Sequence, residues 1–264
     1  MAVVLCAGFL LTALNTVLIY ALQLHGYTAE VFASSMEIAV GLLLIAVLKC
    51  TTNTTLGFTA KGLGEGLLLL SPILALAFFA FESDLSQWVD LGYGPDITLV
   101  LVALLEAGSV GFYEELAYRA IIIDGIAQGS RRTRFWTGKA IIGSALLFGG
   151  IHIINNIYGY QDLFSTFSQI IYALALGLLF AAAYIRTHNL WACAIAHALV
   201  DLGSFLAPGS IAGGYSGAMD VAGTPDATGL ILQLAFMAAI FLAYALFVVR
   251  PNMQGEIEAV WKER

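Results

Sequence analysis

The chain has 264 residues, of which 60% are hydrophobic and only 11% are charged, and its mean hydropathy is +0.88. A soluble domain carries roughly 25% charged residues, so this composition excludes an ordinary water-facing fold. The net charge of −7 also argues against nucleic-acid binding, which requires clustered Lys and Arg. The scattered cysteines Cys6, Cys50 and Cys193 predict neither a disulfide nor a metal pair.

Eight apolar segments are long enough to cross a hydrocarbon core of about 30 Å, which takes roughly 20 helical residues. In chain order they cover residues 2–24, 29–48, 62–81, 97–127, 138–157, 165–185, 188–206 and 228–249. The fourth is too long for one perpendicular crossing, and Ser71-Pro72 should kink the third. We therefore expect an all-α polytopic membrane protein, a bundle of about eight transmembrane helices, with residues 1–264 forming a single transmembrane domain.

The connections between these segments alternate in charge. Lys and Arg gather in the second, fourth and sixth connections and in the C-terminal tail. The third, fifth and seventh connections contain Asp and Glu without any Lys or Arg. The positive-inside rule then predicts that both termini are cytoplasmic, and that residues 82–96 and 207–227 face outside. The first segment has no basic region before it and no convincing cleavage site, so we interpret it as a retained helix.

Three of the segments carry ionisable residues inside the membrane, where a charge costs from about 2.5 to more than 10 kcal/mol. They are Glu114, Glu115 and Arg119 in the fourth segment, His152 in the fifth, and His197 and Asp201 in the seventh. A helix rises about 1.5 Å per residue, so four of these residues lie about 17 to 25 Å from the nearest cytoplasmic basic residue. They are Glu114, His152, His197 and Asp201. This common depth predicts one polar site.

The spacing of these residues indicates how they pair. Glu115 and Arg119 are four residues apart and can form an ion pair on one helix face, whereas Glu114 is rotated by about 100°. His197 and Asp201 have the same spacing, so either both face a common centre or Asp201 accepts an imidazole N–H. Each motif alone is equally compatible with structural helix–helix contacts, but three motifs at one depth favour a functional site.

A carboxylate and two imidazoles in a partly dry pocket can activate water. Glu114 would act as the general base. The histidines and Asp201 would either hold a metal that acidifies the water or polarise a scissile carbonyl. Zn²⁺ is a candidate cofactor, with His152, His197 and either Asp201 or Glu114 as ligands, although no H-E-x-x-H motif is present to establish it.

The three motifs, E-E-x-x-x-R at 114–119, F-x-x-x-H at 148–152 and H-x-x-x-D at 197–201, resemble the ordered motifs of the CPBP family. This family contains CAAX proteases and bacteriocin-processing intramembrane endopeptidases, including prenyl-protein CAAX endopeptidases. The match covers a core of about residues 97–206. The resemblance implies hydrolysis of a peptide bond in a membrane-embedded helical bundle, with Glu114 as the water-activating residue. It carries the remaining site roles over to Glu115, Arg119, His152, His197 and Asp201.

Two residues depart from the pattern of the family. Ala120 stands where many members have Gly, and Asp201 stands where many have Asn; the Asp favours a metal or a charged histidine partner. The resemblance implies a membrane-embedded or prenylated peptide or protein substrate, with either a glutamate-dependent or a metalloprotease mechanism, in a prokaryotic plasma membrane. Alternatives are a proton- or cation-coupled transporter and a non-catalytic bacteriocin-immunity membrane protein.

Overall fold

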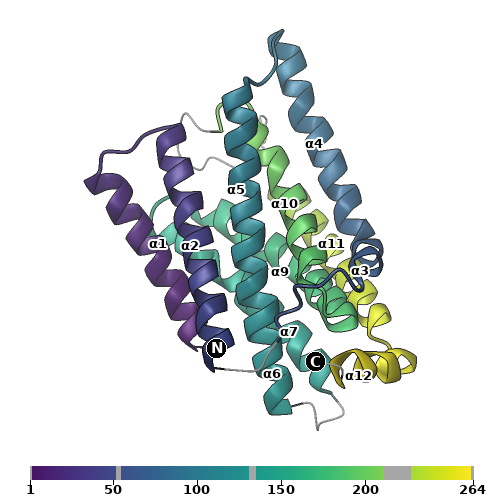
Figure 1. Cartoon of the computed structure of the whole chain (residues 1–264). Helices are drawn as coiled ribbons and strands as arrows, with labels where there is room; N and C mark the ends of the chain where they lie inside the picture. Colours follow the sequence, from purple (N-terminus) through teal and green to yellow (C-terminus); the bar gives the residue numbers. More distant parts are fainter. Residues whose placement is uncertain (1, 52–54, 131–134, 211–226, 263–264) are drawn as a thin grey trace.

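The computed structural model describes residues 2–51, 55–130, 135–210 and 227–262, which form helices joined by short connections (Figure 1). No β-strand occurs in these ranges, so the all-α prediction is confirmed. The elements are α1 (Ala2–Ala21), α2 (Tyr27–Thr51), α3 (Leu63–Leu69), α4 (Ser71–Leu91), α5 (Ile97–Glu115), the π-helix η1 (Leu116–Ile123), α6 (Asp124–Ser130), α7 (Trp136–Ile151), α8 (Ile153–Ile157), α9 (Leu163–Thr187), α10 (Leu190–Leu206), α11 (Ala227–Val248), the 3₁₀-helix η2 (Pro251–Met253) and α12 (Gln254–Lys262).

Several of these helices meet the length and composition of a membrane span. Five do so among the described residues, namely Tyr27–Cys50, Ile97–Gly129, Trp136–Ile157, Leu163–Thr187 and Gly229–Val248. Counting the bent pair α3–α4 as one span makes six. Helix α10 is apolar but shorter, at 17 residues, and α1 is 20 residues long. The chain is a multi-pass membrane protein, and the exact count of eight spans stays a prediction.

The third predicted span has a different course in the structure. The chain breaks at Leu70, and α3 and α4 meet at an angle of 67°. Pro72 lies in the first turn of α4, where its missing N–H is not needed. The prediction that residues 82–96 form a connection is wrong for 82–91, which continue α4. Helix α10 gives this extension a partner, because the indole Nε1 of Trp88 donates to the carbonyl of Leu206 at 2.7 Å.

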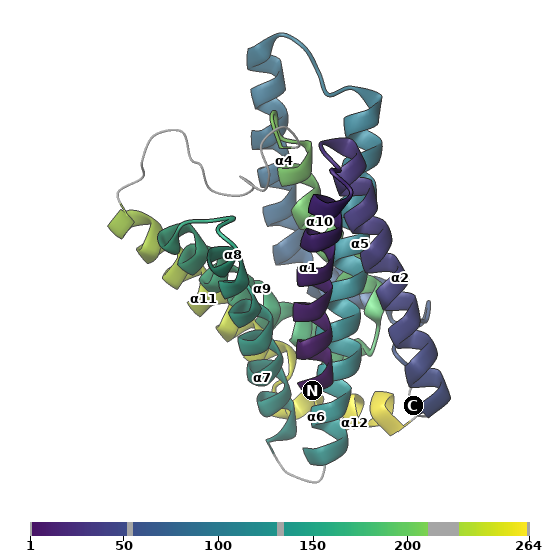
Figure 2. The same ribbon diagram turned by 90° about the vertical axis from the view of Figure 1, so that its left-hand side faces the viewer.

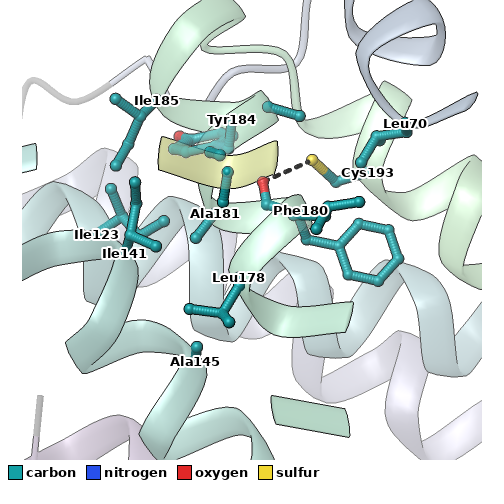
Figure 3. Packing of buried hydrophobic residues seen from close by; sticks show 14 of the residues in the cluster. Leu70, Ile123, Ile141, Ala145, Leu178, Phe180, Ala181, Tyr184, Ile185 and Cys193 are labelled. Atoms are coloured by element: carbon teal, nitrogen blue, oxygen red, sulfur yellow. Dashed lines mark hydrogen bonds between the residues drawn. The ribbon is translucent and has the colours of Figure 1, made fainter. Parts of the chain in front are cut away.

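Helix α9 lies at the centre of the core. Residues 175–185 are all buried, which suits a helix that is apolar on every face. Figure 3 shows Phe180 and Tyr184 of α9 among side chains of the surrounding helices, with the Cys193 Sγ of α10 donating to the Phe180 carbonyl at 3.6 Å. Gly177 allows close packing, because a Cβ there would lie 3.1 Å from Phe148 of α7. This core fixes the positions of α7 and α10 relative to each other.

Polar side chains define where the long helices begin. Asp162 caps α9, accepting hydrogen bonds from the backbone N–H groups of Phe164 at 2.7 Å and Ser165 at 3.1 Å. The hydrogen bond from the Ser165 hydroxyl, together with these two, holds the pKa of Asp162 below its usual value. Asn189 caps α10 by accepting from the N–H of Ala192 at 2.8 Å. These caps fix the starting points of the two helices.

The two ends of the bundle differ in composition. The chain termini, α6 and α12 lie at one end, and the end of α4 with its connection to α5, which carry Asp90 and Asp96, lies at the other (Figure 1). The view turned by 90° shows α7, α9 and α11 inclined to α1, α2 and α5 (Figure 2). The predicted outside connection at 207–227 and the basic residues 131, 132 and 134 lie mostly outside the described residues.

Helix α12 was not expected, because the sequence placed these residues in a charged tail. It packs against the end of α9, where the indole Nε1 of Trp261 donates to the Ile185 carbonyl at 2.7 Å. Its ring lies edge-on to Trp136 at 5.2 Å between centroids. The sequence feature that could have predicted this helix is the apolar pair Ile257 and Trp261. These residues are four apart, so both lie on one helix face.

Candidate active site

Arg119 and Glu115 form a fully buried ion pair, as their spacing predicted. Arg119 Nε donates to Glu115 Oε2 at 2.8 Å, and Nη2 donates to Oε1 at 3.2 Å. Neither side chain has any exposed area. The two-pronged contact matches the fork of the guanidinium to the carboxylate and offsets part of the cost of burying both charges. Arg119 is thereby held beside the helix interface rather than in contact with lipid.

Further contacts fix this guanidinium between α5, α7 and α9. Nη1 of Arg119 donates to the hydroxyl of Ser144 at 2.7 Å, and that hydroxyl donates to the carbonyl of Tyr118 at 2.9 Å. The guanidinium carbon lies 4.9 Å from the ring centre of Phe148 and 5.5 Å from that of Phe180. Arg119 is therefore a structural anchor, whose buried charge holds Glu115 in one orientation.

His197 occupies the centre of a group of three carboxylates. Its Nδ1 lies 3.0 Å from Glu115 Oε1, and its Nε2 lies 3.3 Å from Asp201 Oδ2 and 3.7 Å from Glu114 Oε2. Ionised carboxylates only accept hydrogen bonds, so the arrangement is satisfied when both ring nitrogens carry protons. The ring also stacks on Phe180, with centroids 5.4 Å apart. Contacts on both edges and on one face thus fix the imidazole.

Glu114 and Glu115 are adjacent, yet their surroundings differ. The side chain of Glu114 is 25% exposed, whereas that of Glu115 has no exposed area. Both oxygens of Glu115 are already bonded to Arg119, and one of them also contacts His197. Of the two carboxylates, Glu114 alone can reach water.

His152 lies at the junction of α7 and α8, one helical turn after Phe148. Its Nδ1 is 2.9 Å from the Phe148 carbonyl, which can only accept a hydrogen bond. In the neutral ring, Nδ1 therefore carries the proton and Nε2 keeps its lone pair. The Phe148 ring lies edge-on to both His152 and His197, at 5.7 and 5.6 Å between centroids.

Three of the four side chains predicted to converge make direct contact, and the fourth does not. Glu114, His197 and Asp201 meet through the His197 ring. Within the described ranges, no hydrogen bond joins His152 to any of the three, although it lies within electrostatic reach of His197 and Asp201. The contact between His197 and Glu115 was not foreseen. It depends on how α10 is rotated against α5, and spacing along one helix does not reveal that.

A close contact between α5 and α10 brings these groups together. Gly111 of α5 faces α10, and a Cβ at this position would lie 2.7 Å from the Ala194 carbonyl oxygen and 2.9 Å from the Ala198 nitrogen. Only a glycine lets the two backbones approach this closely. Glu115 lies one turn after Gly111, so the same contact places its carboxylate against His197.

Two residues near the site, Tyr113 and Glu37 of α2, were not among those assigned to it from the sequence. The hydroxyl of Ser109 donates to Glu37 Oε2 at 2.7 Å. The Glu37 carboxylate lies within electrostatic reach of Asp201. Tyr113, immediately before Glu114, is buried, and its hydroxyl has no hydrogen-bond partner within the described residues. The sequence feature that could have identified Tyr113 is its position next to the two glutamates. For Glu37, the feature is a carboxylate in the middle of a predicted span.

The side chains proposed as zinc ligands are His152, His197 and either Asp201 or Glu114. Zinc needs three or more His, Cys, Asp or Glu donors arranged about one point. No such group occurs among the described residues. Each ring nitrogen of His197 already faces a carboxylate, and the Nδ1 of His152 bonds to a backbone carbonyl. In this arrangement the four residues do not fit the ligand set that the sequence suggested.

Comparison with known families identifies this same part of the chain. Residues 96–203 match the family model described as type II CAAX prenyl endopeptidase Rce1-like. The segment begins at the cap of α5, ends within α10 and contains all three motifs. The predicted resemblance to CAAX proteases is therefore confirmed over this segment. Searches of curated proteins and of solved structures each found no match.

Proposed function

Because residues 96–203 match the family model of Rce1-like type II CAAX prenyl endopeptidases, we propose that this membrane protein is an intramembrane endopeptidase in which Glu114 activates water. The observation that carries the proposal is the position of Glu114, partly exposed and 3.7 Å from a histidine that two other carboxylates hold in place. The chain from α1 to α12 acts as one transmembrane domain around this site.

Glu114 is the carboxylate best suited to act as the base. Glu115 has no access to water, and Asp201 lies closer than Glu114 to His197 Nε2, at 3.3 Å. Glu114 is 25% exposed and makes the longest of the three contacts with His197, at 3.7 Å. It takes a proton from the attacking water and returns it to the leaving nitrogen when the tetrahedral intermediate collapses.

The other site residues orient the reacting groups. Glu115 and Asp201 hold His197, whose positive edge limits repulsion between Glu114 and Asp201. His152 presents the lone pair of Nε2, which can accept a hydrogen bond from the same water or from the substrate N–H. Arg119 holds the Glu115 carboxylate in position. No step in this reaction requires a bound metal.

The substrate that best fits this site is a membrane-associated peptide with a lipid-modified cysteine. The support comes from the family, whose description names prenyl endopeptidases, and from a site built within apolar helices. We propose the topology inferred from the charge pattern, with both termini cytoplasmic.

The function is tested with purified protein in lipid nanodiscs and a quenched fluorescent peptide that carries a farnesylated cysteine fourth from its C-terminus. Mass spectrometry of the products should show cleavage after this cysteine. The same peptide without the farnesyl group serves as the matched control and should be cleaved more slowly. Zinc content, measured on the same active preparation, separates a metal-free reaction from one that needs Zn²⁺. An intact farnesylated peptide would contradict the proposal.

A further inference from the structure

Tyr113 has a buried hydroxyl without a hydrogen-bond partner. Its side chain is only 8% exposed, and within the part of the chain that the structure describes no donor or acceptor contacts its hydroxyl oxygen. Buried polar groups in native proteins are nearly always paired, because an unpaired one loses its hydration without compensation. An unpaired group at this position therefore points to a partner that binds during function.

The hydroxyl belongs to the residue just before Glu114 in α5, one helical turn after Ser109, which bonds to Glu37 of α2. It is within electrostatic reach of the carboxylates of Glu114 and Glu37, without being hydrogen-bonded to either. Glu37 is instead bonded to Ser109, and it lies within reach of Asp201. Tyr113 therefore lies beside the proposed general base, on the side of α5 that faces α2.

None of the four side chains Glu114, Asp201, His152 and His197 offers a free neutral hydrogen-bond donor. The carboxylates of Glu114 and Asp201 only accept hydrogen bonds. The Nδ1–H of His152 donates its hydrogen bond to the Phe148 carbonyl, and the Nε2 of the same ring carries a lone pair. Both nitrogens of His197 face carboxylates. Attack of water on a peptide bond places negative charge on the carbonyl oxygen, and that charge requires a donor.

We infer that Tyr113 is a further catalytic residue, whose hydroxyl donates a hydrogen bond to the carbonyl oxygen of the scissile bond. This inference rests on the proposed endopeptidase function. As the water oxygen bonds to the carbonyl carbon, its proton passes to Glu114 and the carbonyl electron pair moves onto oxygen. Tyr113 keeps its own proton and stabilises that oxyanion through the hydrogen bond. Collapse re-forms the carbonyl and breaks the C–N bond, and Glu114 protonates the departing nitrogen.

The test compares Tyr113→Phe with the wild type on the farnesylated peptide. Removing one oxyanion donor lowers kcat by about 10²- to 10³-fold. The KM stays close to that of the wild type, because the donor acts in the transition state. Tyr184→Phe is the matched control, since the Tyr184 hydroxyl is also buried but has a hydrogen-bond partner, Asp124, at 3.2 Å. It should lower the melting temperature and leave kcat unchanged.

Thermal stability gives the second readout and does not depend on the substrate. Tyr113→Phe removes a hydroxyl with no partner, so its melting temperature should equal or exceed that of the wild type. A fall as large as that of Tyr184→Phe would overturn the inference by revealing a structural bond. An unchanged kcat in Tyr113→Phe beside an active wild type would also overturn it and leave the endopeptidase proposal intact. An inactive wild type would instead contradict the endopeptidase proposal and the inference with it.

Discussion

The two adjacent glutamates of α5 acquire different roles because consecutive helical residues point about 100° apart. Glu115 turns toward Arg119 and His197 and is sealed from water, whereas Glu114 keeps a quarter of its side chain exposed. Glu115 can only orient the side chains that it contacts, whereas Glu114 can exchange protons with water. Substitutions at the two positions should therefore have different consequences.

Glu115→Gln should lower both the folded yield and the activity. The change removes the negative partner of Arg119 in the interior of the protein, and breaking a buried ion pair costs about 3–5 kcal/mol. The measurement is the fraction of monodisperse protein recovered after detergent extraction, with Glu114→Gln as the matched control. Equal recovery of the two variants would show that the Arg119 charge does not depend on Glu115.

The pairing of Glu115 with Arg119 could be predicted from the sequence, because both partners lie on one helix and helix geometry alone fixes their spacing. The same holds for His197 and Asp201. The contact between Glu115 and His197 could not be predicted, because it joins two helices whose relative rotation depends on packing throughout the core. Tyr113 was missed for a related reason, since burial of its hydroxyl is a property of the assembled bundle.

At the scale of the elements, the site depends on how closely α5 and α10 approach each other. Helix α5 also passes into the π-helix Leu116–Ile123, which contains Arg119 and lies deep in the core. Such widened turns often occur at functional sites. The apolar runs predicted where the helices lie in the sequence. They did not predict the π-helix, because its wider turns do not change the hydrophobic pattern. The extension of α4 was missed because acidic residues in 82–91 suggested a connection.

Gly111→Ala should separate α5 from α10 and reduce activity and stability together. The added Cβ would lie within 3 Å of backbone atoms of Ala194 and Ala198, which cannot move aside as a flexible side chain can. Gly108→Ala is the matched control, because nothing lies within 4 Å of a Cβ there. The control should be neutral or slightly stabilising, by up to about 1 kcal/mol, because Ala favours helix over Gly.

The readouts for this pair are the melting temperature and the rate of peptide cleavage. Overpacking of this kind typically costs about 1–3 kcal/mol. If the two alanine variants behaved alike, the close contact at Gly111 would not be what brings Glu115 to His197.

At the scale of the whole molecule, the charge pattern and the arrangement of helices agree. The chain termini, α6 and α12 share one end of the bundle, and the end of α4 with its connection to α5, which carry Asp90 and Asp96, lies at the other (Figure 1). Membrane proteins keep Lys and Arg on the cytoplasmic side. The end that carries α12 should therefore face the cytoplasm, and a substrate entering from that side must reach a site deep within the bundle.

Labelling of single cysteines tests this orientation. Asp90→Cys and Glu258→Cys place reporters at opposite ends, in exposed positions of α4 and α12. Cys6 and Cys50 are exposed and must first be replaced by Ser, whereas the buried Cys193 can remain. In intact cells a membrane-impermeant maleimide should label position 90 and not position 258, and permeabilisation should expose both. The reverse pattern would invert the topology.

The central claim is that Glu114 activates the water that cleaves the peptide bond, and Glu114→Gln tests it most directly. The change keeps the volume of the side chain and removes the base. Cleavage of the farnesylated peptide is measured with equal amounts of folded wild-type and variant protein. Loss of a general base lowers the rate by about 10²- to 10⁴-fold, and this is the predicted result. Turnover of the variant close to that of the wild type would contradict the account.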